Sequence, residues 1–294
     1  MIAGRFAVPA LIRAQRLAPL RYEDCPPLLA YQQTKQHIPT MGGLFVLGVA
    51  MAVAALAGGM MAREGWLMLL GTLGMAVVGF ADDAMKYARP NGLGFRSAPK
   101  LLISLGLGAV IGLLTRSFSW GWILFAMVVI AGSAHAVNLT DGMDGLAAGC
   151  GAMAFATLGL AELMQAAPNH VFVTWCASLA GACVGFLWFN AFPASVFLGD
   201  VGAMGLGAAL GVLGVLSRHP LWLAVVGGVF VIEALSVMLQ VASYKWRNKK
   251  RMFRVAPIHH HFHLGGLPEP KVIVRFWIAG ALFAVFGLAW AAHP

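Results

Sequence analysis

Charged residues are scarce in this chain. Asp, Glu, Lys and Arg make up 11% of its 294 residues, whereas apolar residues make up 60%. Soluble globular domains carry about 25% charged residues, so this composition excludes an ordinary soluble protein. Long polar stretches are also absent. Apolar runs of about 15–24 residues alternate with short polar links, the arrangement expected of a chain that crosses a membrane several times.

Cysteine is scarce as well, and this argues against two kinds of site. The four cysteines, Cys25, Cys150, Cys176 and Cys183, show no metal-binding spacing, and three of them lie in apolar runs. We therefore expect small buried residues rather than a disulfide framework.

The first residues contain no apolar stretch long enough for a cleavable signal peptide. The net charge of +9 lies mainly in the links, so we expect no nucleic-acid partner.

These patterns predict an all-α fold: a polytopic helical bundle with about nine transmembrane helices and an active site at its cytoplasmic face. We expect one integral membrane domain over residues 1–294, in which the 36 glycines let helices pack closely. Residues 1–40 are predicted as an interfacial and loop segment, and residues 41–294 as the helices and their loops. The predicted spans are 41–61, 66–81, 101–115, 120–137, a fifth ending near 164, 171–189, 201–216, 221–244 and 272–292.

The links differ in charge between the two sides of the predicted bundle. If the side of Lys35 is cytoplasmic, the opposite links hold only Arg63, Arg116 and Arg218, and every other Lys and Arg lies on the cytoplasmic side or at a helix end next to it. This agrees with the excess of basic residues in cytoplasmic loops. In the same predicted topology, a set of acidic residues and histidines lies on the cytoplasmic side: Asp82, Asp83, Asp141, Asp144, Asp200 and His259–His261.

Carboxylates at a membrane boundary need a partner or a function, because charge at bilayer depth is expensive. Asp82 and Asp83 end the second apolar run, and consecutive helical residues point about 100° apart, so we expect different roles for them. A solvated helix end is the simpler alternative. Asp200 directly precedes an apolar run and could instead be a helix N-cap. Magnesium takes one or two carboxylates plus substrate phosphates, which suits Asp200 with one of the Asp82–Asp83 pair.

The segment NLTDGMDG places Asp141 and Asp144 three residues apart at the mouth of the fifth span. This spacing puts both side chains on one helical face. Its glycines favour close approach of the backbone to a ligand, and a polar nucleoside pocket would suit these groups. The alternative is that Asp141 or Thr140 only caps the following helix.

The run HHHFH does not predict a zinc site, because neighbouring histidines in an extended segment diverge and supply too few ligands. Contact with phosphate or nucleotide and proton transfer are better expectations, with an exposed loop of no function as the alternative. Glu233 lies deep in the eighth span, as either a functional carboxylate or a hydrogen-bond acceptor for a neighbour. His135, in the fourth span, is expected to be a packing residue.

Several segments together resemble the phospho-N-acetylmuramoyl-pentapeptide transferases, one group of the polyprenyl-phosphate sugar-phosphate transferases. They are PTMGG, GFADDAMK, NLTDGMDGLA, FLWFNAFPASVFLGDVG and APIHHHF…PEPKVIVRFW. They occur in the family's order, and the resemblance covers about residues 35–290. The histidine segment favours this group over the sister enzymes that use UDP-N-acetylglucosamine. The resemblance implies a bacterial cytoplasmic-membrane enzyme of cell-wall synthesis. Undecaprenyl phosphate would take phospho-MurNAc-pentapeptide from its UDP carrier, with Mg²⁺, giving lipid I and UMP.

The resemblance also assigns residues to roles. Asp82, Asp83, Asp200 and His259 would be catalytic, with Asp200 also the metal ligand. The other expected substrate contacts are Lys35, Lys86, Lys100, Asn138, Asp141, Asp144, Asn190, Phe197, His260 and His261. The expected partners are undecaprenyl phosphate, UDP-MurNAc-pentapeptide and membrane lipids, and a homodimer is compatible with this interpretation.

The chain departs from the family pattern at several points. The resemblance implies that the first helix of the family is reduced here to MIAGRFAVPALIRAQR, and His135 stands where Asn is common. An inactive lipid-binding relative is therefore one alternative. A transporter is another, although transporters place their sites near the membrane midplane and these carboxylates lie at its edge.

Overall fold

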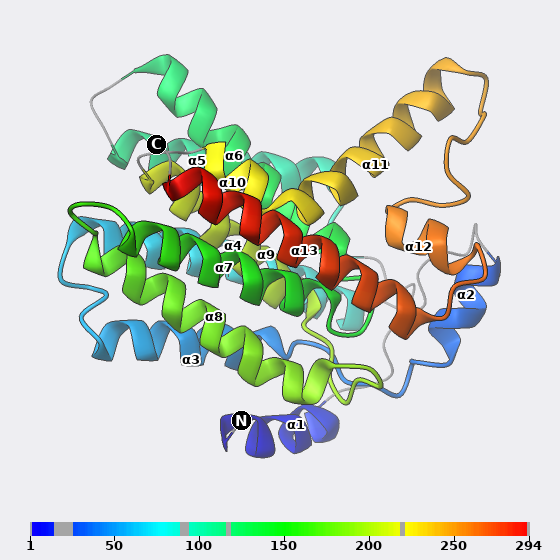
Figure 1. The fold of residues 1–294 in the computed structure, drawn as a ribbon. Helices are drawn as coiled ribbons and strands as arrows, with labels where there is room; N and C mark the ends of the chain where they lie inside the picture. The colour runs from blue at the N-terminus through cyan, green and yellow to red at the C-terminus, as the bar shows by residue number, and fades with distance from the viewer. Residues whose placement is uncertain (1, 15–25, 89–93, 116–118, 218–220, 293–294) are drawn as a thin grey trace.

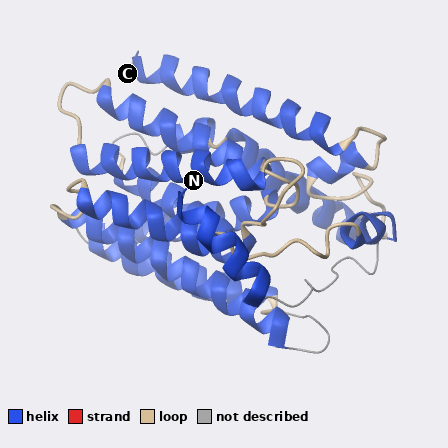
Figure 2. Cartoon of the chain, turned by 90° about the horizontal axis from the view of Figure 1, so that it is seen from below, coloured by secondary structure: helices blue, strands red, loops and turns tan. Residues whose placement is uncertain are grey.

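The computed structural model describes residues 2–14, 26–88, 94–115, 119–217 and 221–292. Helix is the only regular secondary structure in these ranges, which confirms the predicted all-α class (Figure 2). The predictions made for Cys25, Arg116 and Arg218 fall outside the described residues. The helices are α1 (Ile2–Ala14), α2 (Pro26–Gln33), α3 (Gly43–Leu56), α4 (Arg63–Ala88), α5 (Ser97–Thr115), α6 (Trp120–Thr140), α7 (Leu146–Leu163), α8 (His170–Asn190), α9 (Gly199–Leu216), α10 (Leu221–Val226), α11 (Gly228–Trp246), α12 (Ile258–His263) and α13 (Glu269–Ala292).

The described helices support a multi-pass membrane protein. Eight of them, α4 to α9, α11 and α13, are long and apolar enough to cross a membrane. The first predicted span is the apolar helix α3, which is shorter, at 14 residues. The predicted eighth span is interrupted, because α10 ends at Val226 and α11 begins after Gly227. Beyond this break α11 angles away from the other helices (Figure 1).

Two segments that we predicted as irregular are helical. Residues 26–33 form α2, although its two prolines suggested a loop. Both prolines stand in the first turn, where a helix tolerates proline because the missing N–H groups have no partner within the helix. The histidine run forms the short helix α12 rather than an extended strand. In a helix the successive histidines point in different directions, and this separates their environments.

Helix α9 lies at the centre of the bundle and organises its packing (Figure 1). Every residue from Asp200 to Val215 is buried, and α4 and α6 pack against α9 along much of its length. Glycines make this approach possible. A Cβ added to Gly79 of α4 would lie 2.2 Å from the carbonyl oxygen of Asp200. The two backbones therefore touch where the acidic residues stand.

The ends of the helices gather the predicted site residues at one end of the bundle. Helices α4, α6 and α8 finish there, and α5, α7, α9 and α13 start there. Residues far apart in sequence meet at this end because successive long helices cross the bundle in opposite directions. The convergence of the acidic groups, which the sequence predicted, is present in the fold.

The contact between α4 and α9 predicts a large effect of a small substitution. Gly79→Ala places a methyl group against the backbone of Asp200, and overpacking of this kind costs about 1–3 kcal/mol. We expect a lower melting temperature of the purified protein in detergent. Gly106→Ala is the matched control, because a Cβ there has nothing within 4 Å. Equal melting temperatures for the two variants would contradict the proposed contact.

Candidate functional site

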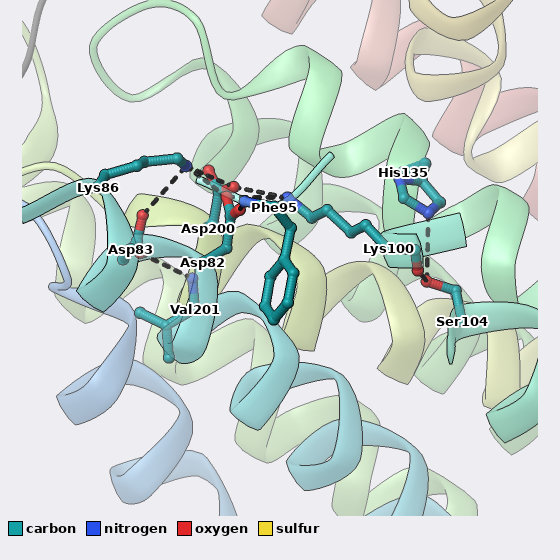
Figure 3. A network of polar contacts seen from close by, with 9 residues as sticks. All are labelled: Asp82, Asp83, Lys86, Phe95, Lys100, Ser104, His135, Asp200 and Val201. Atoms are coloured by element: carbon teal, nitrogen blue, oxygen red, sulfur yellow. Dashed lines mark hydrogen bonds and ion pairs between the residues drawn. The ribbon is translucent and has the colours of Figure 1, made fainter. Parts of the chain in front are cut away.

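Three carboxylates and two ammonium groups form a buried cluster where α4, α5 and α9 meet (Figure 3). Lys86 Nζ lies 2.5 Å from Asp82 Oδ2 and 2.8 Å from Asp200 Oδ2. Lys100 Nζ lies 2.6 Å from the same oxygen of Asp200 and 3.3 Å from Asp82 Oδ2. Asp83 Oδ1 is 3.5 Å from Lys86 Nζ. The cluster joins segments separated by more than 100 residues.

Local structure explains why these side chains converge. Helix α4 continues to Ala88, so Asp82 and Asp83 lie inside a helix and do not close it as we predicted. Lys86 stands one turn beyond Asp82 on the same face. Asp200 is the second residue of α9 and is not its N-cap, which corrects the capping alternative. Asp83 Oδ2 instead accepts the N–H of Val201 at 3.1 Å, so a residue of α4 satisfies a donor in the first turn of α9.

The charges of the cluster leave a negative excess. Asp82, Asp83 and Asp200 are at most 5% exposed, and an oxygen of each lies within 4.8 Å of an oxygen of the others. Three carboxylates against the two lysines leave one net negative charge. An all-oxygen donor set with surplus negative charge suits a hard divalent cation. The cluster can therefore hold a metal ion.

A cavity of about 180 Å³ opens on one side of the cluster. Segments from six helix ends line it, and they bring together most of the residues that the sequence singled out. Those residues are Lys35, Asp83, Lys86, Asn138, Asp141, Asp144, Asn190, Phe197, Asp200 and His260. Its walls are rich in amide, carboxylate and ammonium groups, with the Phe197 ring as an apolar surface. We call it the first cavity.

A second cavity, of about 510 Å³, lies on the other side of the cluster. It shares Lys86, Asn138 and Asp200 with the first cavity and adds a set of its own. That set includes Asp82, Lys100, His135, Phe95, Leu101 and Leu139. The two adjacent aspartates divide between the cavities, because Asp83 lines the first and Asp82 the second. This separation agrees with the angle between consecutive helical residues.

Lys35 is held by two carboxylates, one of which the sequence analysis missed. Its Nζ lies 2.5 Å from Asp144 Oδ1 and 2.6 Å from Glu269 Oε1. Glu269 also accepts the backbone N–H of Asp144 at 3.1 Å. Burial and the neighbouring Glu269 raise the pKa of Tyr31, whose ring lies 4.8 Å from Lys35 Nζ. Glu269 belongs to the segment PEPK that carried the family resemblance, and this was the available signal.

The NLTDGMDG segment is a turn between two helices, which corrects the prediction of one shared helical face. Asp141 follows the end of α6, and α7 begins only at Leu146, with Gly145 as its N-cap in the left-handed region at φ 71°. Asn190 Oδ1 accepts the N–H of Gly145 at 3.1 Å. Asp144 Oδ2 accepts the N–H of Ala194 at 3.0 Å. Both contacts tie the C-terminal end of the turn to the segment that follows α8.

The three consecutive histidines of α12, His259, His260 and His261, occupy three different environments. His260 lines the first cavity. His259 is fully buried and lies behind Gly142, where a Cβ on that glycine would be 2.4 Å from its Nε2. His261 Nδ1 accepts the N–H of Arg254 at 3.1 Å and lines neither cavity. Of the three, only His260 is placed to meet a ligand in these cavities.

Glu233 has a clear partner in the structure. Its Oε2 lies 3.1 Å from His259 Nδ1, and both side chains are completely buried. A carboxylate inside the bundle therefore contacts the histidine that supports the NLTDGMDG turn. The neighbour is a histidine of α12 rather than a residue of the same helix, and a functional role for Glu233 stays a prediction.

Comparison with known proteins gives matches over most of the chain. The sequence pattern of glycosyl transferase family 4 matches residues 65–218, which hold both halves of the aspartate–lysine cluster. A phospho-N-acetylmuramoyl-pentapeptide-transferase of Thermodesulfovibrio yellowstonii is 41% identical over 290 residues, covering 86% of this chain and 80% of the relative. Proteins of the same name from Rickettsia montanensis and Rickettsia felis are 38% and 37% identical over 292 residues, covering 87% of this chain and 80% of each relative.

The buried histidines predict how stability depends on pH. Burial lowers the pKa of His259 to about 3 and that of His260 to about 2. Below pH 6.5 the unfolded chain binds protons at these rings that the folded protein does not, so stability falls as the pH is lowered towards 3. Each ring contributes about 1.4 kcal/mol per pH unit in this range. The melting temperature should therefore drop between pH 7 and pH 5.

Two variants test the assignment of this pH dependence. His259→Gln removes one titrating ring, so the fall in melting temperature between pH 7 and pH 5 should be smaller than in the parent protein. His37→Gln replaces an exposed histidine and should keep the parental slope. If both variants kept the parental slope, the buried ring of His259 would not be its source.

Proposed function

The chain belongs to glycosyl transferase family 4 and, within it, to the phospho-N-acetylmuramoyl-pentapeptide transferases, and from this membership we propose its reaction. It transfers phospho-N-acetylmuramoyl-pentapeptide from a UDP carrier to undecaprenyl phosphate, giving lipid I and UMP. The observation that carries the proposal is the meeting of two cavities at one aspartate–lysine cluster. A transfer between two phosphorylated substrates needs such a place, where both phosphates reach the same charged groups.

The first cavity suits the nucleotide donor. Phe197 offers a ring for stacking, and Asn138, Asn190 and Asp141 offer hydrogen-bonding groups to a base or ribose. Lys35 and Lys86 also line this cavity and would be the cations for the sugar and the diphosphate. The polar lining would leave polar groups unpaired if an apolar ligand entered, which favours a nucleoside.

The second cavity suits the lipid acceptor. Its lining combines Lys86 and Lys100, which would bind a phosphate, with the apolar side chains of Phe95, Leu101 and Leu139. Leu101 and its neighbours Leu102 and Ile103 are exposed on the outer face of α5, the face that a membrane helix turns towards lipid. A phosphate on a polyprenyl chain would reach Lys100 from the membrane by this route.

Magnesium is the cofactor that we propose for the cluster. Asp200 would hold it together with Asp83 or Asp82, in keeping with the carboxylate oxygens that this ion prefers. When bound, the ion would supply Lewis-acid stabilisation to the diphosphate of the donor. Lys86 and Lys100 now neutralise Asp200, and in the loaded enzyme their ammonium groups would be free to turn to the substrate phosphates.

The chain's own residues would then align the two phosphates. Asp82 faces the acceptor side and Asp83 the donor side. Asp82 would position the acceptor phosphate, whereas Asp83 fixes the first turn of α9 and so the position of Asp200. Lys86 and Lys100 would stabilise charge that develops on the phosphoryl oxygens during transfer.

The distribution of basic residues supports a site on the cytoplasmic side of the membrane, from which a water-soluble UDP-linked donor would enter. The membrane that we propose is the bacterial inner membrane. A homodimer stays a prediction. The sister reaction with UDP-N-acetylglucosamine is the alternative with the same chemistry, whereas a transporter or an inactive lipid-binding protein would leave both sugar nucleotides intact.

The reaction is tested with the purified protein, Mg²⁺ and undecaprenyl phosphate. We expect UMP release and lipid I with UDP-MurNAc-pentapeptide and no release with UDP-N-acetylglucosamine. Release with the second donor alone would support the sister enzyme. For the transporter alternative, the protein is placed in liposomes, where an ion flux lost in Asp200→Ala, with sugar-phosphate transfer unchanged, would overturn the proposal.

Asp200→Asn tests the metal site. The substitution keeps the size of the side chain but removes one of the three charges, so we expect the apparent affinity for Mn²⁺, measured by electron paramagnetic resonance, to fall at least ten-fold, about 1.4 kcal/mol. Turnover should be lost as well. Glu64→Gln, at the opposite end of α4, is the control and should bind Mn²⁺ like the parent. Unchanged binding in Asp200→Asn would remove Asp200 as a ligand.

Substitutions of the aspartate pair test the division between the cavities. Asp82→Asn should abolish turnover yet leave binding of the UDP donor within about two-fold of the parent, because Asp82 lines only the second cavity. Asp83→Asn should weaken donor binding, since it lines the first cavity and holds α9. Donor affinity is measured by isothermal titration without the lipid. Equal losses of donor binding in both variants would contradict separate roles.

A further inference from the structure

His135 takes part in a hydrogen-bond chain beside the cluster that determines how its ring is protonated (Figure 3). Its Nε2 lies 3.2 Å from the hydroxyl oxygen of Ser104, and that hydroxyl donates to the carbonyl oxygen of Lys100 at 2.8 Å. A hydroxyl has a single hydrogen, which Ser104 uses on the carbonyl. His135 must therefore donate from Nε2, and Nδ1 is left as an acceptor in the neutral ring.

The free nitrogen belongs to a ring that lines the second cavity. His135 is partly exposed and lines this cavity beside Lys86, Lys100 and Asp200. Ser104 is the one hydrogen-bond partner of the ring among the residues that the structure describes. The packing role that the sequence predicted involves Nε2 alone, so Nδ1 stays available to a ligand in the second cavity.

We propose that His135 is a binding contact for the acceptor phosphate, with Nδ1 as the contacting atom. The ligand class is a phosphate monoester on a lipid chain. Such a group has a second pKa near 6, so near neutral pH a fraction still carries one P–O–H, which can donate to Nδ1. The adjacent Lys100 binds the phosphate through its charge, and His135 would orient it through this hydrogen bond. The inference rests on the proposed function, because it assigns the second cavity to the lipid acceptor.

Because Nε2 and Nδ1 have different partners, two substitutions of His135 can remove them one at a time. In His135→Gln the longer amide reaches the position of Nε2, keeps a donor for Ser104 and loses Nδ1. In His135→Asn the shorter amide keeps a polar atom at the position of Nδ1 and loses the donor to Ser104. A contact with substrate through Nδ1 and a merely structural role through Ser104 therefore predict opposite orders of activity.

Steady-state kinetics with the two substrates varied in turn distinguishes these roles. Since a hydrogen bond is worth about 0.5–1.5 kcal/mol, His135→Gln should raise the KM for undecaprenyl phosphate roughly three- to ten-fold. The KM for the UDP donor should stay within about two-fold, and His135→Asn should lie closer to the parent. Parental kinetics in His135→Gln with a loss only in His135→Asn would overturn the proposal, as would an equal rise of both KM values.

A binding measurement without turnover separates this proposal from the proposed function. Native mass spectrometry compares retention of undecaprenyl phosphate with that of undecaprenol, which lacks the phosphate. We expect the parent to retain the phosphate form preferentially, and His135→Gln to lose much of this preference at an unchanged melting temperature. If the parent bound the phosphate form in this way but released no UMP, the reaction would be wrong and the contact right. Equal preference in parent and variant would refute the contact.

Discussion

Close approach of two helix backbones, at Gly79 of α4 and Asp200 of α9, is the constraint on which the site depends. It brings three carboxylates into one buried place, and such a concentration of charge is unfavourable unless cations accompany it. Lys86, one turn after Asp82, and Lys100, at the start of α5, supply them. The same charges that must be neutralised in the resting protein are then available for phosphates and a metal ion.

The position of this cluster between two cavities connects packing with chemistry. Because consecutive residues of a helix point in different directions, Asp82 and Asp83 can serve two compartments without any irregularity in α4. One compartment is lined mainly by polar and charged residues, and the other combines lysines with apolar side chains, of which Leu101 is also exposed on the surface of α5. A water-soluble donor and a membrane-bound acceptor can thus approach the same charges from different phases.

Much of this arrangement was predictable from the sequence, and the exceptions have physical reasons. The apolar runs predict the helices, and the distribution of Lys and Arg predicts the end of the bundle at which the carboxylates gather. Local patterns could not show that Asp83, and not Asp200, would serve the first turn of α9, because that donor and acceptor come from different helices. Nor could they show that Glu269 holds Lys35, since a link of more than 200 residues leaves no periodic signal. Helix α2 was missed because prolines in a first turn look the same as prolines in a loop.

Glu233 shows how the membrane part of the fold can stiffen the site. Its carboxylate is completely buried in α11 and meets His259 of α12, which in turn fills the space behind Gly142. Removing water from both groups is costly, and replacing them by apolar residues would often be as stable. Because the pair adds little stability, we explain it by what it positions. The contact holds α12 against the turn that carries Asp141 and Asp144. A ligand that enters the first cavity therefore meets His260 and this turn already in place, which reduces the ordering that binding must impose.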